Sequence, residues 1–474
     1  MPIATVNPAN GRTLRTFEAL GAAEIEQRLA AAHAAFGHWR TTDFEERAQL
    51  LGLAADLLDE DQQDIARTMT TEMGKPFAAA RAEAAKCAKA MRWYALRAEE
   101  LLADEHPAPA DVADSGAARA FVRHRPLGVV LAVMPWNFPL WQVVRFAAPA
   151  LMAGNVGLLK HASNVPQTAL YLEGLFCRAG YPEGCFQTLL VGSGAVESVL
   201  RDPRVAAATL TGSEPAGRSV ASIAGDEVKR TVLELGGSDP YLVLPSADVA
   251  AAARTAVTAR TQNNGQSCIA AKRFIVHAGV YEEFAERFTA GMRALTVGDP
   301  MRESTDIGPL ASERGRADLE ELVDDAVRRG AEVLCGGGRP EGLGPELENG
   351  WFYAPTVLTG VTPAMRIHRE ETFGPVATLY RVESLDEAMA LANDSSFGLS
   401  SNVWTRDAAE ARRCVRDLEA GGVYFNGMTA SHPALPFGGV KRSGYGRELA
   451  GHGIREFCNT TTVWYGPESV GASG

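Results

Sequence analysis

Residues 127–139, LGVVLAVMPWNFP, decide the fold class of this 474-residue chain. An apolar run ends in two prolines and a polar side chain, which predicts a buried strand leading into a turn. Four further runs follow at the spacing of strands that alternate with helices: VGLLK (156–160), FQTLLV (186–191), AAATLT (206–211) and TVLEL (231–235). Strands separated in this way pair in parallel through right-handed crossovers. The sequence therefore predicts an α/β fold with a doubly wound sheet.

Polar and glycine residues follow the apolar runs. They are Pro135-Trp136-Asn137, Lys160, Gly192-Ser193-Gly194, Gly212-Ser213 and Glu234-Leu235-Gly236-Gly237. In doubly wound sheets, ligands bind beyond the carboxyl ends of the strands. We therefore expect these segments to line one site.

The rest of the chain divides by composition. Residues 22–102 have helical spacing with a break at Gly74 and Pro76, and residues 103–118 have the composition of a linker or arm. The tail GPESVGASG (466–474) is expected to be disordered. Strand–helix alternation returns between 238 and 440 and predicts a second α/β domain, through PYLVL (240–244), RFIVH (273–277), AEVLCGG (331–337), GPVATLY (374–380), SSNVW (400–404) and GGVYFN (421–426).

Composition argues against several classes of function. With 46 Lys and Arg against 58 Asp and Glu, the net charge of −12 disfavours binding of nucleic acid or an anionic membrane through bulk charge. Residues 126–144 are uncharged over the length of a membrane span, but their prolines favour a strand and a turn. Seven scattered cysteines and nine isolated histidines predict no disulfide framework and no metal site. The start MPIATVNPANGR lacks signal-peptide features, so we expect a cytoplasmic protein.

A glycine-containing segment, residues 212–219, follows a strand and opens a helix. The free N–H groups of a helix N-terminus suit a phosphate or pyrophosphate. A P-loop NTPase would require Lys where Arg218 stands. The dinucleotide fingerprint G-x-G-x-x-G is also absent, because Gly192-Ser193-Gly194 is followed by Glu197 where its third glycine should stand. Dinucleotide binding and a plain turn both stay open on this spacing.

Cys268 and Glu234 are the residues with the clearest chemical potential. Cys268 ends the polar turn NNGQSC (263–268), a setting typical of a reactive thiol; the alternative is the commoner role of cysteine as a small buried apolar residue. Glu234 is the only carboxylate in TVLELGG (231–237), at a strand end. A buried carboxyl there would have a raised pKa and could act as a base, and a strand-end salt bridge is the alternative.

Seven motifs together resemble the ordered motifs of the NAD(P)-dependent aldehyde dehydrogenase superfamily, across nearly the whole chain. They are PWNFP (135–139), Gly154-Asn155 leading to Lys160, TGS (211–213), ELGG (234–237), GQSC (265–268), ETFGP (371–375) and PFGG (436–439). Within that superfamily, the runs MPWNFPLWQV, LLKHASNVP, LELGGSDP and AAKRFIV are most similar to bacterial succinate-semialdehyde dehydrogenases.

The resemblance implies a mechanism. The thiolate of Cys268 would attack the aldehyde carbon. The side-chain amide of Asn137 and the backbone N–H of Cys268 would stabilise the oxyanion. After hydride transfer to the cofactor, Glu234 would activate the water that hydrolyses the thioester. A nucleotide-binding or structural protein that keeps the fold without turnover is the alternative of a different class.

The resemblance also implies a cofactor site. Gly212 and Ser213 would meet the pyrophosphate, Trp136 and Lys160 the adenosine ribose, and Glu371 and Phe373 the nicotinamide ribose. Ser163 stands where relatives that favour NAD often place a carboxylate, so we predict that NADP is preferred over NAD; the alternative is that Ser163 caps a turn. The remaining residues expected at this site are Pro135, Thr211, Leu235 and Gly236.

For the substrate, the resemblance implies a site for a distal carboxylate. Arg145 lies in the apolar run WQVVRFAAPAL (141–151), and a guanidinium matches a carboxylate bidentately; a structural ion pair is the alternative. Ser431 would assist Arg145, and Trp141 and Phe437 complete the expected substrate residues. Some relatives carry a second arginine where this chain has Gln262, so an aldehyde dehydrogenase of other or broad specificity remains the runner-up.

Finally, the resemblance implies a three-part subunit. The cofactor-binding domain would comprise residues 1–107 and 127–235, and the catalytic domain residues 236–440. An oligomerisation arm would comprise residues 108–126 and 455–467. Such an arm leaves strand edges for a second subunit, so a homodimer or homotetramer is expected.

Overall fold

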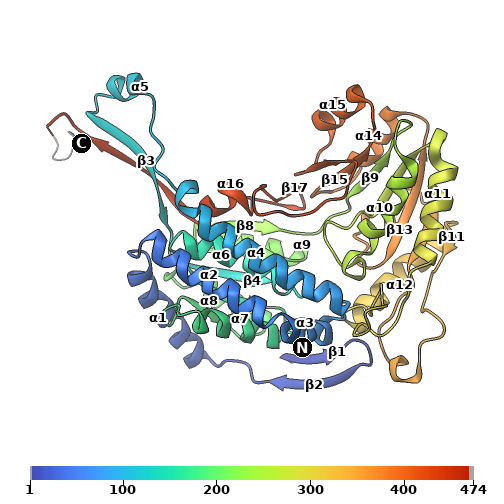
Figure 1. Cartoon of the computed structure of the whole chain (residues 1–474), viewed down its shortest axis with the longest axis horizontal. Coiled ribbons are helices and arrows are strands. Elements are labelled where there is room, and N and C mark those ends of the chain that lie inside the picture. Colours follow the sequence, from blue (N-terminus) through green and yellow to red (C-terminus); the bar gives the residue numbers. More distant parts are fainter. Residues whose placement is uncertain (1–2, 469–474) are drawn as a thin grey trace.

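The computed structural model describes residues 3–468. Most of the expected disordered tail, residues 469–474, lies outside this range, as do residues 1–2. Within it, a six-stranded sheet and a seven-stranded sheet form the two main units, and a two-stranded sheet extends from the first unit (Figure 1).

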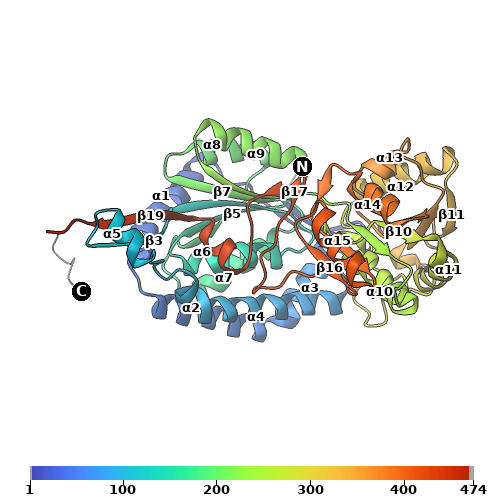
Figure 2. The same ribbon diagram turned by 90° about the horizontal axis from the view of Figure 1, so that it is seen from above.

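The first unit contains the sheet predicted around residues 127–139. Its strand order is β18-β8-β7-β4-β5-β6, and all pairs are parallel except β18 with β8. Helices α8 and α9 lie on one side of it and α6 and α7 on the other (Figure 2), so the predicted doubly wound sheet is confirmed. The strands are β4 Val129–Met134, β5 Val156–His161, β6 Phe186–Thr188, β7 Val205–Thr211, β8 Arg230–Glu234 and β18 Gly444–Tyr445; the helices are α6 Trp141–Met152, α7 Pro166–Arg178, α8 Val196–Arg201 and α9 Glu214–Asp226.

The second unit contains the sheet of order β11-β12-β13-β10-β9-β15-β16, parallel except for the pair β11 and β12. Its strands are β9 Pro240–Val243, β10 Arg273–His277, β11 Glu332–Cys335, β12 Thr356–Thr359, β13 Val376–Val382, β15 Ser401–Trp404 and β16 Val423–Phe425. Its helices are α10 Val249–Thr261, α11 Ala278–Arg293, α12 Glu313–Arg328, α13 Arg366–Arg369, α14 Leu385–Asn393 and α15 Ala408–Asp417. The sequence reasoning missed β12, because a four-residue strand with threonine at both ends lacks a distinctive apolar pattern.

The N-terminal segment forms helices, as the spacing predicts, of which the first contacts the first sheet and the next three pack against α6 and α7. They are α1 Ala22–Trp39, α2 Phe44–Glu60, α3 Gln62–Met73 and α4 Phe77–Leu101. Gly74 ends α3 with φ 80°, the left-handed geometry that glycine adopts without steric cost. A hairpin, β1 Ile3–Asn7 and β2 Arg12–Phe17, precedes them and was not predicted, because β2 is almost entirely exposed and shows no buried alternation.

The two-stranded sheet joins distant parts of the chain. Strand β3 Arg119–Pro126 pairs antiparallel with β19 Cys458–Tyr465, and helix α5 Pro109–Asp114 precedes β3. Both views show this sheet extending away from the rest of the chain (Figures 1 and 2). Between the units, β14 Phe397–Gly398 pairs with β17 Val440–Lys441, and α16 Ala450–Arg455 leads the chain back to β19.

The uncharged stretch 126–144 is divided between the end of β3, β4, a turn and the start of α6. Within residues 3–468, no helix is both long and apolar enough to cross a membrane. The same residues contain no cluster of three histidine, cysteine or carboxylate side chains placed to hold a metal ion.

Candidate functional site

A cavity of about 310 Å³ opens beyond the carboxyl ends of β4, β7 and β8, where the second unit meets the first sheet. It is lined by Pro135, Trp136, Asn137, Gln142, Thr211, Gly212, Ser213, Leu235, Gly236, Cys268, Glu371 and Phe373. All of these except Gln142 are residues that the sequence reasoning selected. Parallel strands place their carboxyl ends at one edge, which brings together segments that are far apart in sequence.

Two expected cofactor residues lie outside this lining. Lys160 is the fifth residue of β5, and burial lowers its pKa. Ser163 is partly exposed in the turn after β5, and its carbonyl accepts a hydrogen bond from Ala4 N at 3.1 Å. Inside the lining, Trp136 meets Phe373 edge to face with ring centroids 5.7 Å apart, so two aromatic side chains border the cavity.

The loop before Cys268 is held in an unusual backbone conformation. Asn263 and Asn264 both have left-handed φ values, 56° and 58°, and asparagine tolerates this region better than other non-glycine residues. Asn264 Nδ2 donates to Gly74 O at 2.9 Å and to Pro309 O at 3.0 Å. These amide contacts fix the loop before any ligand arrives.

The same loop fixes Asn137. Asn137 donates from its side-chain Nδ2 to Gln266 O at 3.1 Å, and the backbone carbonyl of Asn137 accepts from Asn263 Nδ2 at 2.7 Å. Asn137 is 4% exposed and lies in the turn after β4. The predicted oxyanion donor and the predicted nucleophile are therefore joined by direct hydrogen bonds between their segments.

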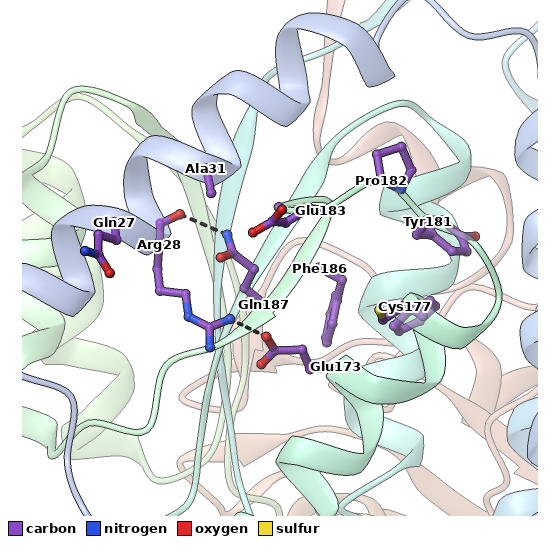
Figure 3. Close-up of a pocket in the computed structure, with 12 residues that line it drawn as sticks. Gln27, Arg28, Ala31, Glu173, Cys177, Tyr181, Pro182, Glu183, Phe186 and Gln187 are labelled. Atoms are coloured by element: carbon purple, nitrogen blue, oxygen red, sulfur yellow. Dashed lines mark hydrogen bonds and ion pairs between the residues drawn. The ribbon is translucent and has the colours of Figure 1, made fainter.

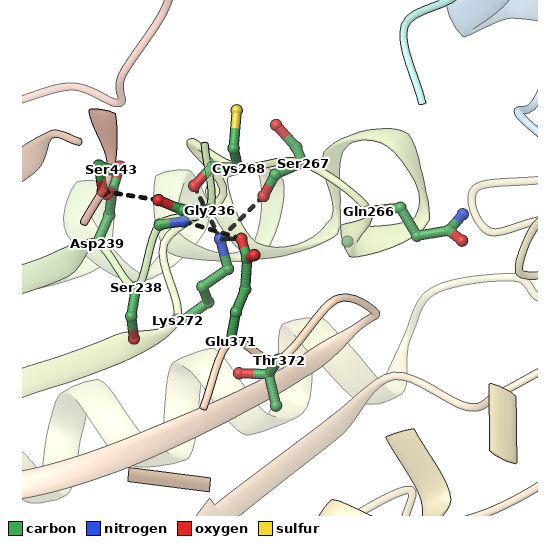
Figure 4. A network of polar contacts seen from close by, with 12 residues as sticks. Gly236, Ser238, Asp239, Gln266, Ser267, Cys268, Lys272, Glu371, Thr372 and Ser443 are labelled. Atoms are coloured by element: carbon green, nitrogen blue, oxygen red, sulfur yellow. Dashed lines mark hydrogen bonds and ion pairs between the residues drawn. The ribbon is translucent and has the colours of Figure 1, made fainter. Parts of the chain in front are cut away.

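Lys272 connects the nucleophile loop to Glu371 (Figure 4). Its Nζ donates to the carbonyls of Ser267 at 2.9 Å and Cys268 at 2.8 Å, and lies 3.2 Å from Glu371 Oε1. Gly237 N also donates to Glu371 Oε1, at 3.0 Å. The close-up shows Cys268 Sγ pointing away from the Lys272 ammonium. The sequence reasoning missed Lys272, although a lysine just before the apolar strand β10 was a signal that a buried charge needs partners.

Two glycines make this arrangement possible. A Cβ on Gly236 would come within 2.6 Å of Glu371 Oε2, and a Cβ on Gly237 within 2.5 Å of Cys268 O. Any larger residue at either position would displace the carboxylate or the nucleophile loop. The Gly-Gly pair after Glu234 is thus explained by close approach rather than by a turn alone.

The charges around Cys268 oppose one another. Burial is the main cause that raises the pKa of the Cys268 thiol, to about 12. The positive charges of Arg145 and Lys272 lower this pKa, and the carboxylates of Glu371 and Glu234 raise it. The thiol is therefore protonated in the resting protein, and its ionisation responds to each of these four charges.

Glu234 ends β8 and is 2% exposed. Its pKa is raised well above the ordinary value by burial and by the nearby carboxylate of Glu448. Neither of its carboxyl oxygens has a hydrogen-bond partner among the described residues, so the strand-end salt bridge that was the alternative is not formed there. A buried carboxyl with a raised pKa is suited to proton transfer near neutrality.

Arg145 forms an ion pair, which was the alternative to its predicted substrate role. Its Nε contacts a carboxylate oxygen of Glu448, and both side chains are buried. Its Nη2 also lies 3.4 Å from Thr211 Oγ1, and its guanidinium lies 4.7 Å from the ring centroid of Phe437. This ion pair accounts for the buried cation on the apolar helix α6, which requires a counter-charge, and substrate binding by Arg145 stays a prediction. The partner, Glu448, was missed by the sequence reasoning.

The other expected substrate residues lie around Trp141, the first residue of α6. Trp141 Nε1 donates to Ser431 Oγ at 3.1 Å. Lys86, from α4, donates to the same Ser431 oxygen at 2.8 Å and was also missed by the sequence reasoning. The structure therefore brings Trp141 and Ser431 together and places Phe437 against Arg145.

A second cavity, of about 490 Å³, lies between α1 and the α7–β6 segment (Figure 3). Arg28 pairs with Glu173 across it, and Gln187 Nε2 donates to Arg28 O at 2.9 Å. Its lining contains none of the predicted site residues. The cavity at the strand ends is therefore the better candidate for chemistry.

Comparison with known families agrees with this geometry. The model of the aldehyde dehydrogenase family matches residues 1–463. The chain belongs to this family. It is 61% identical to a succinate-semialdehyde dehydrogenase (NADP⁺) of Mycobacterium avium, over all of this chain and 99% of that protein. It is also 61% identical to succinate-semialdehyde dehydrogenase (NADP⁺) 1 of Mycobacterium tuberculosis, over 98% of this chain and all of that protein.

Solved structures give the same assignment for this aldehyde dehydrogenase. The crystal structure of succinic semialdehyde dehydrogenase from Streptococcus pyogenes in complex with NADP⁺ superposes with a TM-score of 0.93 at 36% identity, over 98% of this chain and all of that one. The crystal structure of succinate-semialdehyde dehydrogenase from Burkholderia pseudomallei has the same TM-score at 37% identity, over 98% of this chain and 95% of that one. The aldehyde-dehydrogenase-like fold expected from the motifs is therefore confirmed.

Proposed function

We propose that this aldehyde dehydrogenase oxidises succinic semialdehyde to succinate with NADP⁺. The observation that carries the proposal is the single cavity that is lined by Cys268, Asn137 and nine of the eleven residues expected to hold the cofactor. Full-length identity of 61% to enzymes named for this substrate and cofactor supports it.

The lining of the cavity carries groups that suit parts of a dinucleotide. Ser213 is the N-cap of the thirteen-residue helix α9, and Gly212 precedes it, so backbone N–H groups and the positive end of the helix dipole face the lining. Trp136 and Phe373 supply aromatic surface, and Glu371 supplies a carboxylate for ribose hydroxyls. Bound NADP⁺ would supply the hydride acceptor of the reaction.

The chain's own residues would carry the remaining steps. The Cys268 thiolate would attack the aldehyde carbon and form a thiohemiacetal, with the oxyanion stabilised by the Asn137 amide and the Cys268 N–H. After hydride loss leaves a thioester on Cys268, Glu234 would take a proton from water. The resulting hydroxide would release the acid and restore the thiol.

Ser163 supports the choice of NADP⁺ over NAD⁺. It is uncharged and partly exposed in the turn after β5, where a carboxylate would repel a 2′-phosphate. Lys160, three residues earlier, adds a positive charge.

The decisive experiment is the initial rate of reduced-cofactor formation with succinic semialdehyde and with butyraldehyde, each with NADP⁺ and NAD⁺. We expect the highest kcat/KM for the semialdehyde with NADP⁺, and loss of activity in Cys268→Ala. Equal kcat/KM for the two aldehydes would instead favour an aldehyde dehydrogenase of broad specificity. Activity retained by Cys268→Ala would overturn the nucleophile assignment.

We further propose that β3 and β19, within residues 108–126 and 455–467, form an oligomerisation arm. In the described residues these two strands form a two-stranded sheet, and the outer edge of β3 has one further bridge, between Val122 and Glu105, so most of that edge and the outer edge of β19 can be extended by a second subunit. Light scattering of the purified protein should give a dimer or tetramer. A monomer would refute the arm.

A further inference from the structure

Lys86 on α4 contacts two of the residues proposed to bind substrate. Its Nζ donates to Ser431 Oγ at 2.8 Å and lies 4.1 Å from the ring centroid of Trp141. Trp141 Nε1 donates to the same Ser431 oxygen at 3.1 Å. A hydroxyl that accepts two hydrogen bonds still has its own O–H to donate. Lys86 and Ser431 therefore form a compact pair of donors beside an aromatic wall.

Within the described part of the chain, Lys86 has no carboxylate partner, whereas the neighbouring buried cations do. Lys75 pairs with Glu83, and Arg145 pairs with Glu448. No carboxylate of residues 3–468 lies within salt-bridge distance of Lys86, whose recorded partners are neutral. A partly buried cation with only neutral partners is stabilised when an anion arrives.

The titration of Lys86 is consistent with this imbalance. Burial lowers its pKa to about 8, and the positive charges of Arg145 and Lys75 act in the same direction. Glu83 and the Cys87 thiol, both on α4, act in the opposite direction. An anionic ligand beside Nζ would raise this pKa and hold the ammonium form.

We propose that Lys86 is a specificity-determining residue that binds the distal carboxylate of the aldehyde substrate, with Ser431 as the second donor. Lys86 would act in addition to Arg145, whose Nε contacts Glu448. The inference rests on the proposed function, from which it takes a substrate with a carboxylate remote from the aldehyde.

The test compares KM and kcat of Lys86→Gln for succinic semialdehyde and for butyraldehyde, which has the same chain length but no charge. We expect KM for the semialdehyde to rise about 10- to 100-fold, the loss typical of a hydrogen bond from a charged group. Its kcat, and KM for butyraldehyde, should change less than threefold. Lys86→Arg should retain most of the preference because it keeps a cation.

Lys89→Gln is the matched control, since Lys89 is exposed on the same helix one turn later. It should leave both KM values unchanged. Ser431→Ala, which removes only a hydroxyl, gives an independent arm and should raise KM for the semialdehyde selectively by about threefold or more. Equal effects of Lys86→Gln on both aldehydes, or no effect on either, would overturn the inference.

Failure of the proposed function can be recognised separately in the wild-type protein. A wild-type enzyme that does not prefer the semialdehyde overturns that function and this inference together. A wild-type preference that persists in Lys86→Gln overturns the inference alone.

Discussion

Replacing Lys272 by Met removes the ammonium that ties the nucleophile loop to Glu371. Methionine keeps an unbranched apolar stem in a site where Lys272 is 1% exposed. The carbonyls of Ser267 and Cys268 lose a charged donor, and Glu371 keeps its hydrogen bond from Gly237 N. The loop would then relax while the rest of the cavity stays in place.

The expected size of the effect follows from these contacts. A hydrogen bond to a charged group contributes about 1.5–3 kcal/mol, so the two carbonyl bonds together stabilise the loop by about 3–6 kcal/mol. Only the part of this energy that positions Cys268 and the oxyanion donors affects the rate. For comparison, losing one pre-organised oxyanion donor costs about 2.7–4 kcal/mol. We therefore expect kcat/KM to fall about 10²-fold. The pKa of Cys268 should also rise, because Lys272 is one of the charges that lower it.

The assay is steady-state NADPH formation, together with the rate of Cys268 alkylation by iodoacetamide at pH 8. Both should fall in Lys272→Met. Lys229→Met is the matched control, because Lys229 donates to two backbone carbonyls, Leu200 O at 2.6 Å and Asp202 O at 2.7 Å, away from the cavity. It should lower Tm but not kcat/KM. The reasoning fails if Lys272→Met stays within threefold of wild type, or if the two variants lose activity equally.

Three further outcomes are expected. Asn137→Ala should lower kcat by about 10²–10³-fold with little change in KM, measured by steady-state kinetics, because it removes an oxyanion donor; a loss confined to KM would contradict that role. Ser163→Glu should shift the ratio of kcat/KM for NADP⁺ to that for NAD⁺ toward NAD⁺ by at least tenfold, and an unmoved ratio would mean that Ser163 is remote from the 2′-phosphate. In pH profiles, kcat/KM for succinic semialdehyde should fall above about pH 8 as Lys86, whose pKa is lowered by burial, loses its proton. Butyraldehyde, or Lys86→Arg, should not show this limb, and a limb common to both aldehydes would assign it to another group.

The residues that could be predicted from the sequence follow strands or open helices. Gly212, Glu234 and Asn137 each follow an apolar run, and the rule that parallel strands present their carboxyl ends at one edge is enough to bring them together. The family motifs add Cys268 and Glu371, which come from the second unit. For these residues, the local sequence pattern and the sheet topology are enough to predict that they lie in one site.

The residues that could not be predicted take their roles from tertiary partners. Lys86 lies on a long helix in which a lysine suggests an exposed face, and only the fold places Ser431 beside it, 345 residues later in the chain. Glu448 follows the second unit, at the point where the chain returns to the first sheet, so its pairing with Arg145 has no local signal. The partner of each buried charge depends on tertiary packing, so the hydrophobic pattern of the sequence does not predict it.

The pairing of Arg145 with Glu448 bears on the pKa of the proposed base, Glu234. Two buried carboxyl groups, Glu234 and Glu448, lie near one guanidinium, and Arg145 contacts Glu448 directly. Burial and the negative charge of Glu448 raise the pKa of Glu234, and each outweighs the lowering by Arg145, so the neutral form of Glu234 is favoured.

That state suits the first half of the proposed reaction and opposes the second. When Glu234 is neutral, it has no negative charge to raise the pKa of Cys268. The thiolate therefore forms more readily than it would beside an ionised Glu234. Thioester hydrolysis needs an ionised Glu234, and by then the thiolate charge is gone. Because Arg145 lowers the pKa of both Cys268 and Glu234, it stabilises negative charge on whichever of the two bears it. Its ion pair with Glu448 therefore serves the proposed chemistry as well as the stability of helix α6.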